Sequence, residues 1–295
     1  MSSDTLPTPI VSTAWLADHL HEPWVRVVDA SMFLPNAGRN AQAEYRERHI
    51  PGAVFAELGF LSDENAAYPH TLLPADTFAT RVGSLGIGSA HAIVVYDTSG
   101  QNFSAPRLWW MLRAFGHQHV AVLDGGLKKW LAEGRDVDAN TPEVTPATFE
   151  AHFDSDRLRD MAEMRNNVNT KREQVLDARS AGRFEATEPE PRAGVRGGHI
   201  PGSVNVPYAS LMNNNGTMRS RDELAHIVKK AGVDTNAPIV ASCGTGVTAC
   251  AVILALDVLG VSNTAVFDGS WTEWGSATDT ATPVETGPAR NAAAH

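Results

Sequence analysis

Short runs of aliphatic residues alternate with longer amphipathic stretches along most of the chain. The aliphatic runs are rich in Val and Ile, as in strands buried on both faces, and lie at 25–28, 93–96, 121–123, 175–176, 239–242 and 265–267. The amphipathic stretches have apolar residues three and four positions apart, which predicts helices at 76–85, 105–115, 221–231 and 247–259. Strands that alternate with helices predict an α/β fold, with a mainly parallel sheet covered by helices on both faces.

This pattern of strands and helices occurs twice along the chain. An aliphatic run ends in Asp29 and again in Asp177, and the segment His-Ile-Pro-Gly at 49–52 returns at 199–202. Landmarks that recur in one order at a nearly fixed offset indicate two copies of one domain. We expect the domains and their connections at 1–140 (N-terminal domain), 141–160 (linker), 161–282 (C-terminal domain) and 283–295 (disordered tail).

Several repeated residues are expected to be structural. His49 and His199 occupy the two repeated turns, so they are expected to make hydrogen bonds that hold these turns. The tryptophans are expected in the core, at positions 109, 110, 130, 271 and 274.

Cys243 stands between the aliphatic run 239–242 and the predicted helix. The intervening loop is Gly244, Thr245, Gly246, Val247 and Thr248. Its glycines permit backbone torsions that turn successive N–H groups toward the sulfur, forming an anion-binding nest. The amino end of the following helix adds to this effect, and both favour the nucleophilic thiolate. The alternative is a buried cysteine with a structural role only.

The two copies differ at this position. Asp97 stands where the second copy has Cys243, and the loop that follows Asp97 contains no thiol. Only the C-terminal copy is therefore expected to be catalytic.

The loop composition separates several classes of cysteine chemistry. A cysteine phosphatase needs a cation near the sixth residue after the nucleophile, where this chain has Ala249. A disulfide oxidoreductase needs a second cysteine three residues on, where Gly246 stands. A hydrolase needs a histidine base, for which His70 is a candidate. A thiolate that accepts a sulfur atom and carries it as a persulfide fits the neutral loop.

The composition argues against nucleic-acid and membrane partners and indicates a reducing cellular compartment. The net charge of −10 gives no basic field for nucleic acid, and no apolar run is long enough to span a membrane. The N-terminus lacks the features of a signal peptide. Cys250 lies within the same predicted helix and is poorly placed to pair with Cys243, which fits a reducing, cytoplasmic location. No spacing of Cys and His residues predicts a metal site, and no phosphate-binding fingerprint predicts a nucleotide cofactor.

The segment Cys-Gly-Thr-Gly-Val-Thr-Ala at 243–249 resembles the active-site loop of 3-mercaptopyruvate sulfurtransferases, within the tandem-domain rhodanese superfamily. The resemblance covers about residues 10–280 and includes the segments 104–110, 182–184, 187–192 and 268–271. The thiosulfate-using relatives carry basic residues directly after the cysteine, where this chain has Gly244 and Thr245. This difference favours 3-mercaptopyruvate as the sulfur donor.

The resemblance implies a role for each matching residue. Cys243 is the nucleophile and persulfide carrier, and Arg183 and Arg192 bind the carboxylate and keto oxygen of the substrate. Thr245 and His70 match residues proposed to assist proton transfer, whereas Gly59 stands at the family's aspartate position. The loop residues that contact the substrate are Gly244, Gly246, Val247 and Thr248.

The resemblance also implies the partners. Sulfur passes from 3-mercaptopyruvate to cyanide or to a thiol such as that of thioredoxin, and no cofactor takes part. Two alternatives remain, a thiosulfate:cyanide sulfurtransferase and a non-catalytic binding module.

Overall fold

The computed structural model describes residues 6, 9–34 and 37–289. The chain divides into two compact units. Unit 1 runs as far as Glu64 and adds Leu72–Asp154 and Met212–Met218, while unit 2 contains Asn65–Thr71, Ser155–Leu211 and the chain from Arg219 onward. Each unit thus takes one short segment from the opposite half of the chain.

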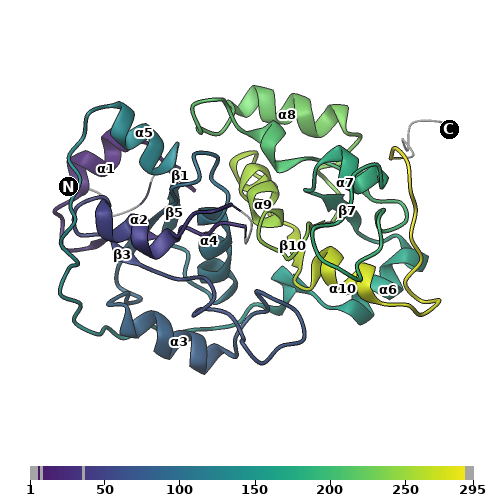
Figure 1. Cartoon of the computed structure of the whole chain (residues 1–295), viewed down its shortest axis with the longest axis horizontal. Coiled ribbons are helices and arrows are strands. Elements are labelled where there is room, and N and C mark those ends of the chain that lie inside the picture. The colour runs from purple at the N-terminus through teal and green to yellow at the C-terminus, as the bar shows by residue number, and fades with distance from the viewer. Residues whose placement is uncertain (1–5, 7–8, 35–36, 290–295) are drawn as a thin grey trace. The chain divides into compact units, whose positions relative to one another are not determined.

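Unit 1 contains a five-stranded sheet in the order β1-β5-β4-β2-β3, in which every pair of neighbours is parallel. Most of this unit is coloured from purple to teal in Figure 1. The strands are β1 (Ile10–Val11), β2 (Val25–Asp29), β3 (Val54–Phe55), β4 (Ala92–Tyr96) and β5 (Val120–Leu123). The helices are α1 (Thr13–His19), α2 (Ala41–Glu47), α3 (Ala75–Ser84), α4 (Ala105–Ala114) and α5 (Gly126–Ala132).

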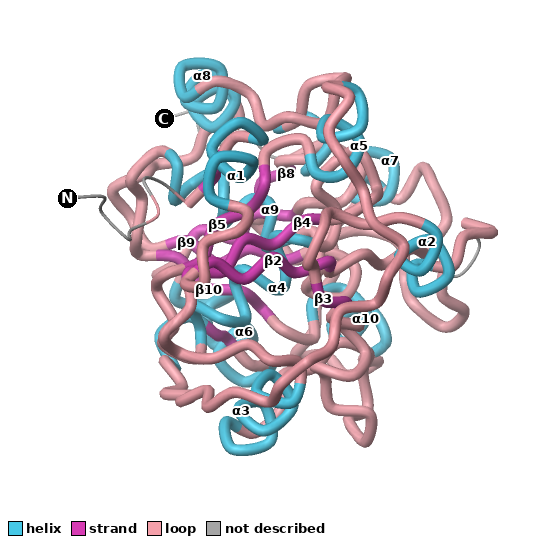
Figure 2. Tube along the Cα trace, turned by 90° about the vertical axis from the view of Figure 1, so that its left-hand side faces the viewer, coloured by secondary structure: helices cyan, strands magenta, loops and turns pink. Residues whose placement is uncertain are grey.

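Unit 2 repeats this topology with the order β6-β10-β9-β7-β8, again parallel throughout. The strands are β6 (Leu158–Arg159), β7 (Gln174–Asp177), β8 (Val204–Asn205), β9 (Ile239–Ser242) and β10 (Thr264–Phe267). The helices are α6 (Met161–Thr170), α7 (Ala181–Glu185), α8 (Arg221–Lys230), α9 (Ala249–Val258) and α10 (Ser270–Ser276). Single turns of 3₁₀ helix occur at Ser155–Arg157 and Tyr208–Leu211. The predicted α/β fold is confirmed in both copies. Figure 2 shows helices (cyan) on either side of the strands (magenta).

The longer predicted elements are present, and the differences lie at the sheet edges and chain ends. The strands β1, β3, β6 and β8 are two residues long, too short to show a periodic pattern. Residues 147–154 of the expected linker pair with unit 1, for example through the N–H of Ala147 and the carbonyl of Gly83 at 2.9 Å. The expected disorder of the tail differs from the structure at 283–289, because Glu285 and His199 exchange two backbone hydrogen bonds. Residues 290–295 lie outside the described residues.

The core of unit 2 fixes the ends of β9 and β10. Val240 of β9 and Phe267 of β10 pack with Met164 of α6 and with Trp271 and Trp274 of α10. The helix α9 is almost entirely buried and packs against the same two strands. Helices pack against the central strands of the sheet, and Cys243 directly follows the carboxyl end of β9.

The repeated histidines hold turns, as expected. Both rings are buried, and Nδ1 lies 2.7 Å from the carbonyl oxygen of Tyr45 in His49 and 2.8 Å from that of Phe184 in His199. The five tryptophans expected in the core are each at most 2% exposed.

Candidate active site

Cys243 is the first residue after β9 and is 1% exposed. The loop that follows leads into α9, which begins at Ala249. Of the two loop glycines, Gly246 has a φ of +76°, a conformation that glycine adopts at little cost. Gly244 has no positive φ, so the loop requires the special conformation at one glycine only.

The start of α10 anchors the loop. The backbone N–H of Cys243 donates to Oγ of Ser270 at 3.1 Å, and the N–H of Trp271 donates to the carbonyl of Cys243 at 2.9 Å. The Gly244 carbonyl accepts from both the N–H and the hydroxyl of Thr272, at 2.9 and 2.6 Å. Ser270 is held at a φ of +49°, an unfavourable conformation for a residue with a side chain.

This anchoring sets the direction of the loop's N–H groups. In a trans peptide the N–H points opposite to the C=O, so carbonyls of Cys243 and Gly244 that face α10 turn the next N–H groups away from it. Among the residues that the structure describes, the backbone N–H groups of Gly244, Thr245, Val247 and Thr248 have no hydrogen-bond acceptor. Free N–H groups beside a helix amino end can accommodate an anion, and these groups belong to the loop directly after Cys243.

Thr245 and His70 lie together within unit 2. Nδ1 of His70 is 3.0 Å from Oγ1 of Thr245, and Thr245 is 8% exposed. His70 belongs to the segment Asn65–Thr71 and has a φ of +68°. The unusual conformation of a non-glycine residue brings a titratable ring to a loop hydroxyl two residues from Cys243.

Arg183 lies beside the residue that follows the nucleophile. A Cβ placed on Gly244 would be 3.3 Å from Nη2 of Arg183. The guanidinium forms an ion pair with Glu190, at 2.6 Å between Nη2 and Oε2 and 3.3 Å between Nε and Oε1. Its side chain remains 24% exposed, so a ligand can reach it.

Arg192 is placed differently. It follows Pro191 in an irregular segment and is partly exposed. Within the described parts of the chain its side chain forms no hydrogen bond or ion pair. A guanidinium without a protein partner is available to a carboxylate ligand.

The comparison with known families identifies the family of both copies. The model of the rhodanese-like domain matches residues 12–133 and 160–277, which is most of the chain in two copies. The chain belongs to the rhodanese family.

Full-length rhodanese-family relatives carry two different names. The 3-mercaptopyruvate sulfurtransferases of Mus musculus and Escherichia coli K12 are 43% and 41% identical over 279 residues, covering 93% and 94% of this chain and 94% and 98% of the relatives. The thiosulfate sulfurtransferase of Cricetulus griseus is 42% identical over 283 residues, covering 93% of this chain and 94% of the relative. Identity alone therefore does not separate the two sulfur donors.

A solved rhodanese-fold structure matches the whole architecture. The crystal structure of SseA from Escherichia coli, described as a 3-mercaptopyruvate sulfotransferase, superposes with a TM-score of 0.82 at 39% identity. The match covers 90% of this chain and 99% of SseA.

Sequence reasoning missed the residues that support the rhodanese site. Arg179 is fully buried, where it pairs with Asp177 at 2.6 Å and with Glu190 at 2.7 Å. Ser270 and Thr272, which anchor the loop, were also not predicted. Two signals were present in the sequence: Arg179 follows two residues after the strand-ending Asp177, and Glu190 is the one residue between two prolines.

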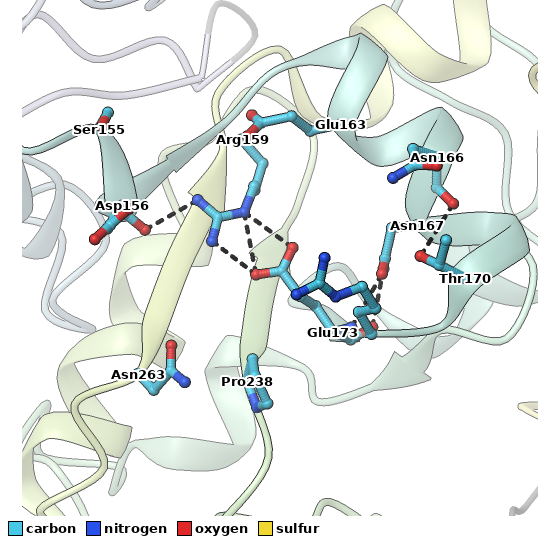
Figure 3. A pocket seen from close by; sticks show the side chains of 11 residues that line it. Ser155, Asp156, Arg159, Glu163, Asn166, Asn167, Thr170, Glu173, Pro238 and Asn263 are labelled. Carbon is cyan, nitrogen blue, oxygen red and sulfur yellow. Dashed lines mark hydrogen bonds and ion pairs between the residues drawn. The ribbon is translucent and has the colours of Figure 1, made fainter.

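A pocket of about 390 Å³ in unit 2 lies away from these residues. It is found at the amino ends of the strands, near Pro238 before β9 and Asn263 before β10, whereas Cys243 follows the carboxyl end of β9. Figure 3 shows Arg159 and Glu173 joined across it by hydrogen bonds, the shortest of 2.8 Å. None of the predicted site residues lines this pocket.

Neither a metal site nor a spanning helix is present in the described regions. No group of three or more His, Cys, Asp and Glu side chains there is arranged to hold a metal ion. None of the described helices is long and apolar enough to cross a membrane.

Proposed function

We propose that this protein transfers sulfur from 3-mercaptopyruvate to a thiol acceptor through a persulfide on Cys243. The observation that carries the proposal is the uncharged loop after Cys243, in which the N–H groups of Gly244, Thr245, Val247 and Thr248 have no acceptor among the described residues. Such groups stabilise a negative sulfur before the reaction and the persulfide after it. Both cysteines are free, which leaves Cys243 available as the nucleophile.

The charges near the loop favour a singly charged donor. Arg183 and Arg179 carry two positive charges, and the carboxylates of Asp177 and Glu190 compensate them. Arg192, which has no partner among the described residues, is the cation that we assign to the donor's carboxylate. A dianion such as thiosulfate would lose hydration here without a second uncompensated cation, so 3-mercaptopyruvate fits better.

The proposed reaction has two half-reactions. The Cys243 thiolate attacks the sulfur of 3-mercaptopyruvate, so that an S–S bond forms and the C–S bond breaks. The electron pair of the C–S bond passes to the carbon and generates the enolate of pyruvate, which Arg183 and Arg192 stabilise. Protonation of the enolate then releases pyruvate, with the His70–Thr245 pair as the proposed proton carrier.

The second half-reaction regenerates the enzyme. An acceptor thiolate attacks the outer sulfur of the persulfide, takes it as its own persulfide, and frees the Cys243 thiolate. Cyanide can act in the same way and leave as thiocyanate. A thioredoxin-like dithiol is the proposed acceptor, and two free cysteines fit the reducing cytoplasm as the proposed location.

The test compares donors on one preparation. Steady-state kcat/KM is measured with 3-mercaptopyruvate and with thiosulfate, and intact mass follows the addition of one sulfur atom in the absence of acceptor. A higher kcat/KM for 3-mercaptopyruvate and a single added sulfur that is lost in Cys243→Ser are expected. The conservative change Cys250→Ser serves as the control and is expected to retain most activity.

The names of the relatives keep thiosulfate as the second candidate. A higher kcat/KM for thiosulfate would replace the proposed donor, whereas absence of any persulfide would favour the non-catalytic binding module.

A further inference from the structure

Glu190 is a buried carboxylate shared by two arginines. Its side chain is 5% exposed, and it binds Arg179 through Oε1 at 2.7 Å and Arg183 through Oε2 at 2.6 Å. Arg179 is also held by Asp177 and by the carbonyl of Gly198 at 2.7 Å, so it does not depend on Glu190 alone. Among the described residues Arg183 has no other side-chain acceptor, so Glu190 both orients and neutralises this guanidinium.

The position of Arg183 gives Glu190 influence over the reacting centre. The guanidinium lies against Gly244, directly after the nucleophile. The Arg183 side chain is still 24% exposed, so an incoming donor can reach it, and Glu190 holds the compensating negative charge. A donor at the loop therefore meets a cation whose charge is largely balanced by a fixed neighbour.

We propose that Glu190 determines donor specificity, by lowering the positive charge that Arg183 presents to the sulfur donor. This inference rests on the proposed function and deepens it by naming the residue that favours singly charged donors. The interaction of a fixed charge with a donor scales with the donor's charge. Removing one negative charge therefore favours a dianion about twice as much, in free energy, as a monoanion at the same place.

The decisive variant is Glu190→Gln, which keeps the size and one acceptor for Arg183 but removes the charge. We expect the ratio of kcat/KM for thiosulfate to kcat/KM for 3-mercaptopyruvate to rise at least about fivefold. The matched control is Glu188→Gln, which removes the same charge from an exposed carboxylate two residues away that binds Ser180. Its ratio is expected to change by less than about twofold.

A second variant tests the same balance in the opposite direction. Arg183→Gln removes the cation itself, so the ratio is expected to fall, because the dianion loses more than the monoanion. The change Glu190→Asp keeps the charge and shortens the side chain, so it is expected to lower kcat/KM for both donors while leaving the ratio within about twofold. Iodoacetamide labelling of Cys243 and thermal unfolding verify that each variant is folded.

The outcomes separate this inference from the proposed function. If the unaltered protein forms no persulfide with 3-mercaptopyruvate, the proposed function fails. If it does, and folded Glu190→Gln leaves the ratio unchanged, only the role of Glu190 is wrong. Should Glu190→Gln not fold, Arg183→Gln decides: a fall in the ratio supports the charge balance, and an unchanged or higher ratio overturns it.

Discussion

A loop with backbone N–H donors follows each of two central strands, β4 in unit 1 and β9 in unit 2. In unit 1 an aspartate accepts these donors, which we call the filled site; in unit 2 four of the donors have no acceptor among the described residues, which we call the open site. In unit 1 the strand is followed by Asp97, whose Oδ2 accepts the N–H groups of Ser104 and Ala105 at the start of α4, each at 2.9 Å. Its Oδ1 accepts the N–H and hydroxyl of Ser99 at 2.9 and 2.5 Å. A built-in anion therefore occupies the N–H groups of its own loop.

In unit 2 the corresponding residue is Cys243, and four N–H groups of its loop have no acceptor within the described chain. The difference indicates that this loop geometry is suited to an anion. One copy stabilises the fold with a carboxylate of its own, whereas the other leaves the same kind of site open for the charge that the Cys243 sulfur carries in the proposed reaction.

The largest expected effect comes from filling the open site. Cys243→Asp places a carboxylate where unit 1 has one, so sulfur transfer should fall at least about 1000-fold, the scale of losing an essential nucleophile. The variant should unfold at a higher urea concentration than Cys243→Ala at neutral pH, because its carboxylate accepts the loop N–H groups. Equal urea midpoints for the two variants would show that the loop is not an anion site.

Emptying the filled site is the reciprocal change. Asp97→Ala leaves the N–H groups of Ser99, Ser104 and Ala105 without their acceptor, and those of Ser104 and Ala105 are buried, so the free energy of unfolding should fall by about 3 kcal/mol. Urea titration measures this change. Asp18→Ala, at an exposed residue of α1, is the matched control and should stay within about 0.5 kcal/mol. A loss as small as that of the control would contradict the role given to Asp97.

The neighbouring strand ends differ in a related way. Asp177 is paired with Arg179, whereas Asp29 has Ser31 at that position, with the N–H of Ser31 at 2.8 Å. Burial of Asp29 without a cation raises its pKa from 3.8 to about 6. A folded-state pKa above the unfolded value means that the stabilisation is complete below about pH 4 and is lost as the pH rises through 6.

Asp29→Asn tests this difference, because the amide resembles the protonated acid. The unaltered protein should lose up to about 3 kcal/mol of unfolding free energy between pH 4 and pH 7 from this group, and the variant should lack that part of the slope. Urea titrations at several pH values measure it. Identical slopes in the two proteins would mean that Asp29 is not the group that titrates.

The smallest expected effect concerns the donor in the open site. Arg192→Leu removes a cation without a protein partner, so kcat/KM for 3-mercaptopyruvate should fall about tenfold or more, since a charge-assisted bond to a carboxylate contributes about 1.5–3 kcal/mol. The free energy of unfolding should change by less than about 0.5 kcal/mol. A large loss of stability with unaltered kinetics would identify Arg192 as a structural residue.

Much of the fold could be predicted because its signals are local. The ends of strand β9 and helix α9 differ by at most two residues from the expected ranges. A continuous apolar run and a helix that is apolar on every face can be recognised from the local sequence alone. The two-residue strands β1 and β6 were missed, because their pairing with β5 and β10 depends on residues more than a hundred positions away.

The residues of the candidate site could be predicted only where they belong to one continuous segment of the sequence. Cys243 and its loop are contiguous, so their chemistry follows from the sequence. The neighbour of Thr245 is His70, 175 positions away, and only the family resemblance indicated it. Glu190 and Ser270 were missed because a carboxylate between two prolines and a serine at a helix start have many ordinary explanations, and only three-dimensional proximity to Arg183 and Cys243 gives them a role.

The exchange of short segments between the halves has a consequence for how this protein could have descended from a single-domain ancestor. The duplicated halves are similar in topology, yet unit 2 includes Asn65–Thr71 and unit 1 includes Met212–Met218. A chain divided at the sequence midpoint would leave the C-terminal fragment with Cys243 but without His70. Once the segments had been exchanged, the duplication could no longer be reversed by simple loss of one half, because each gene fragment would encode an incomplete unit.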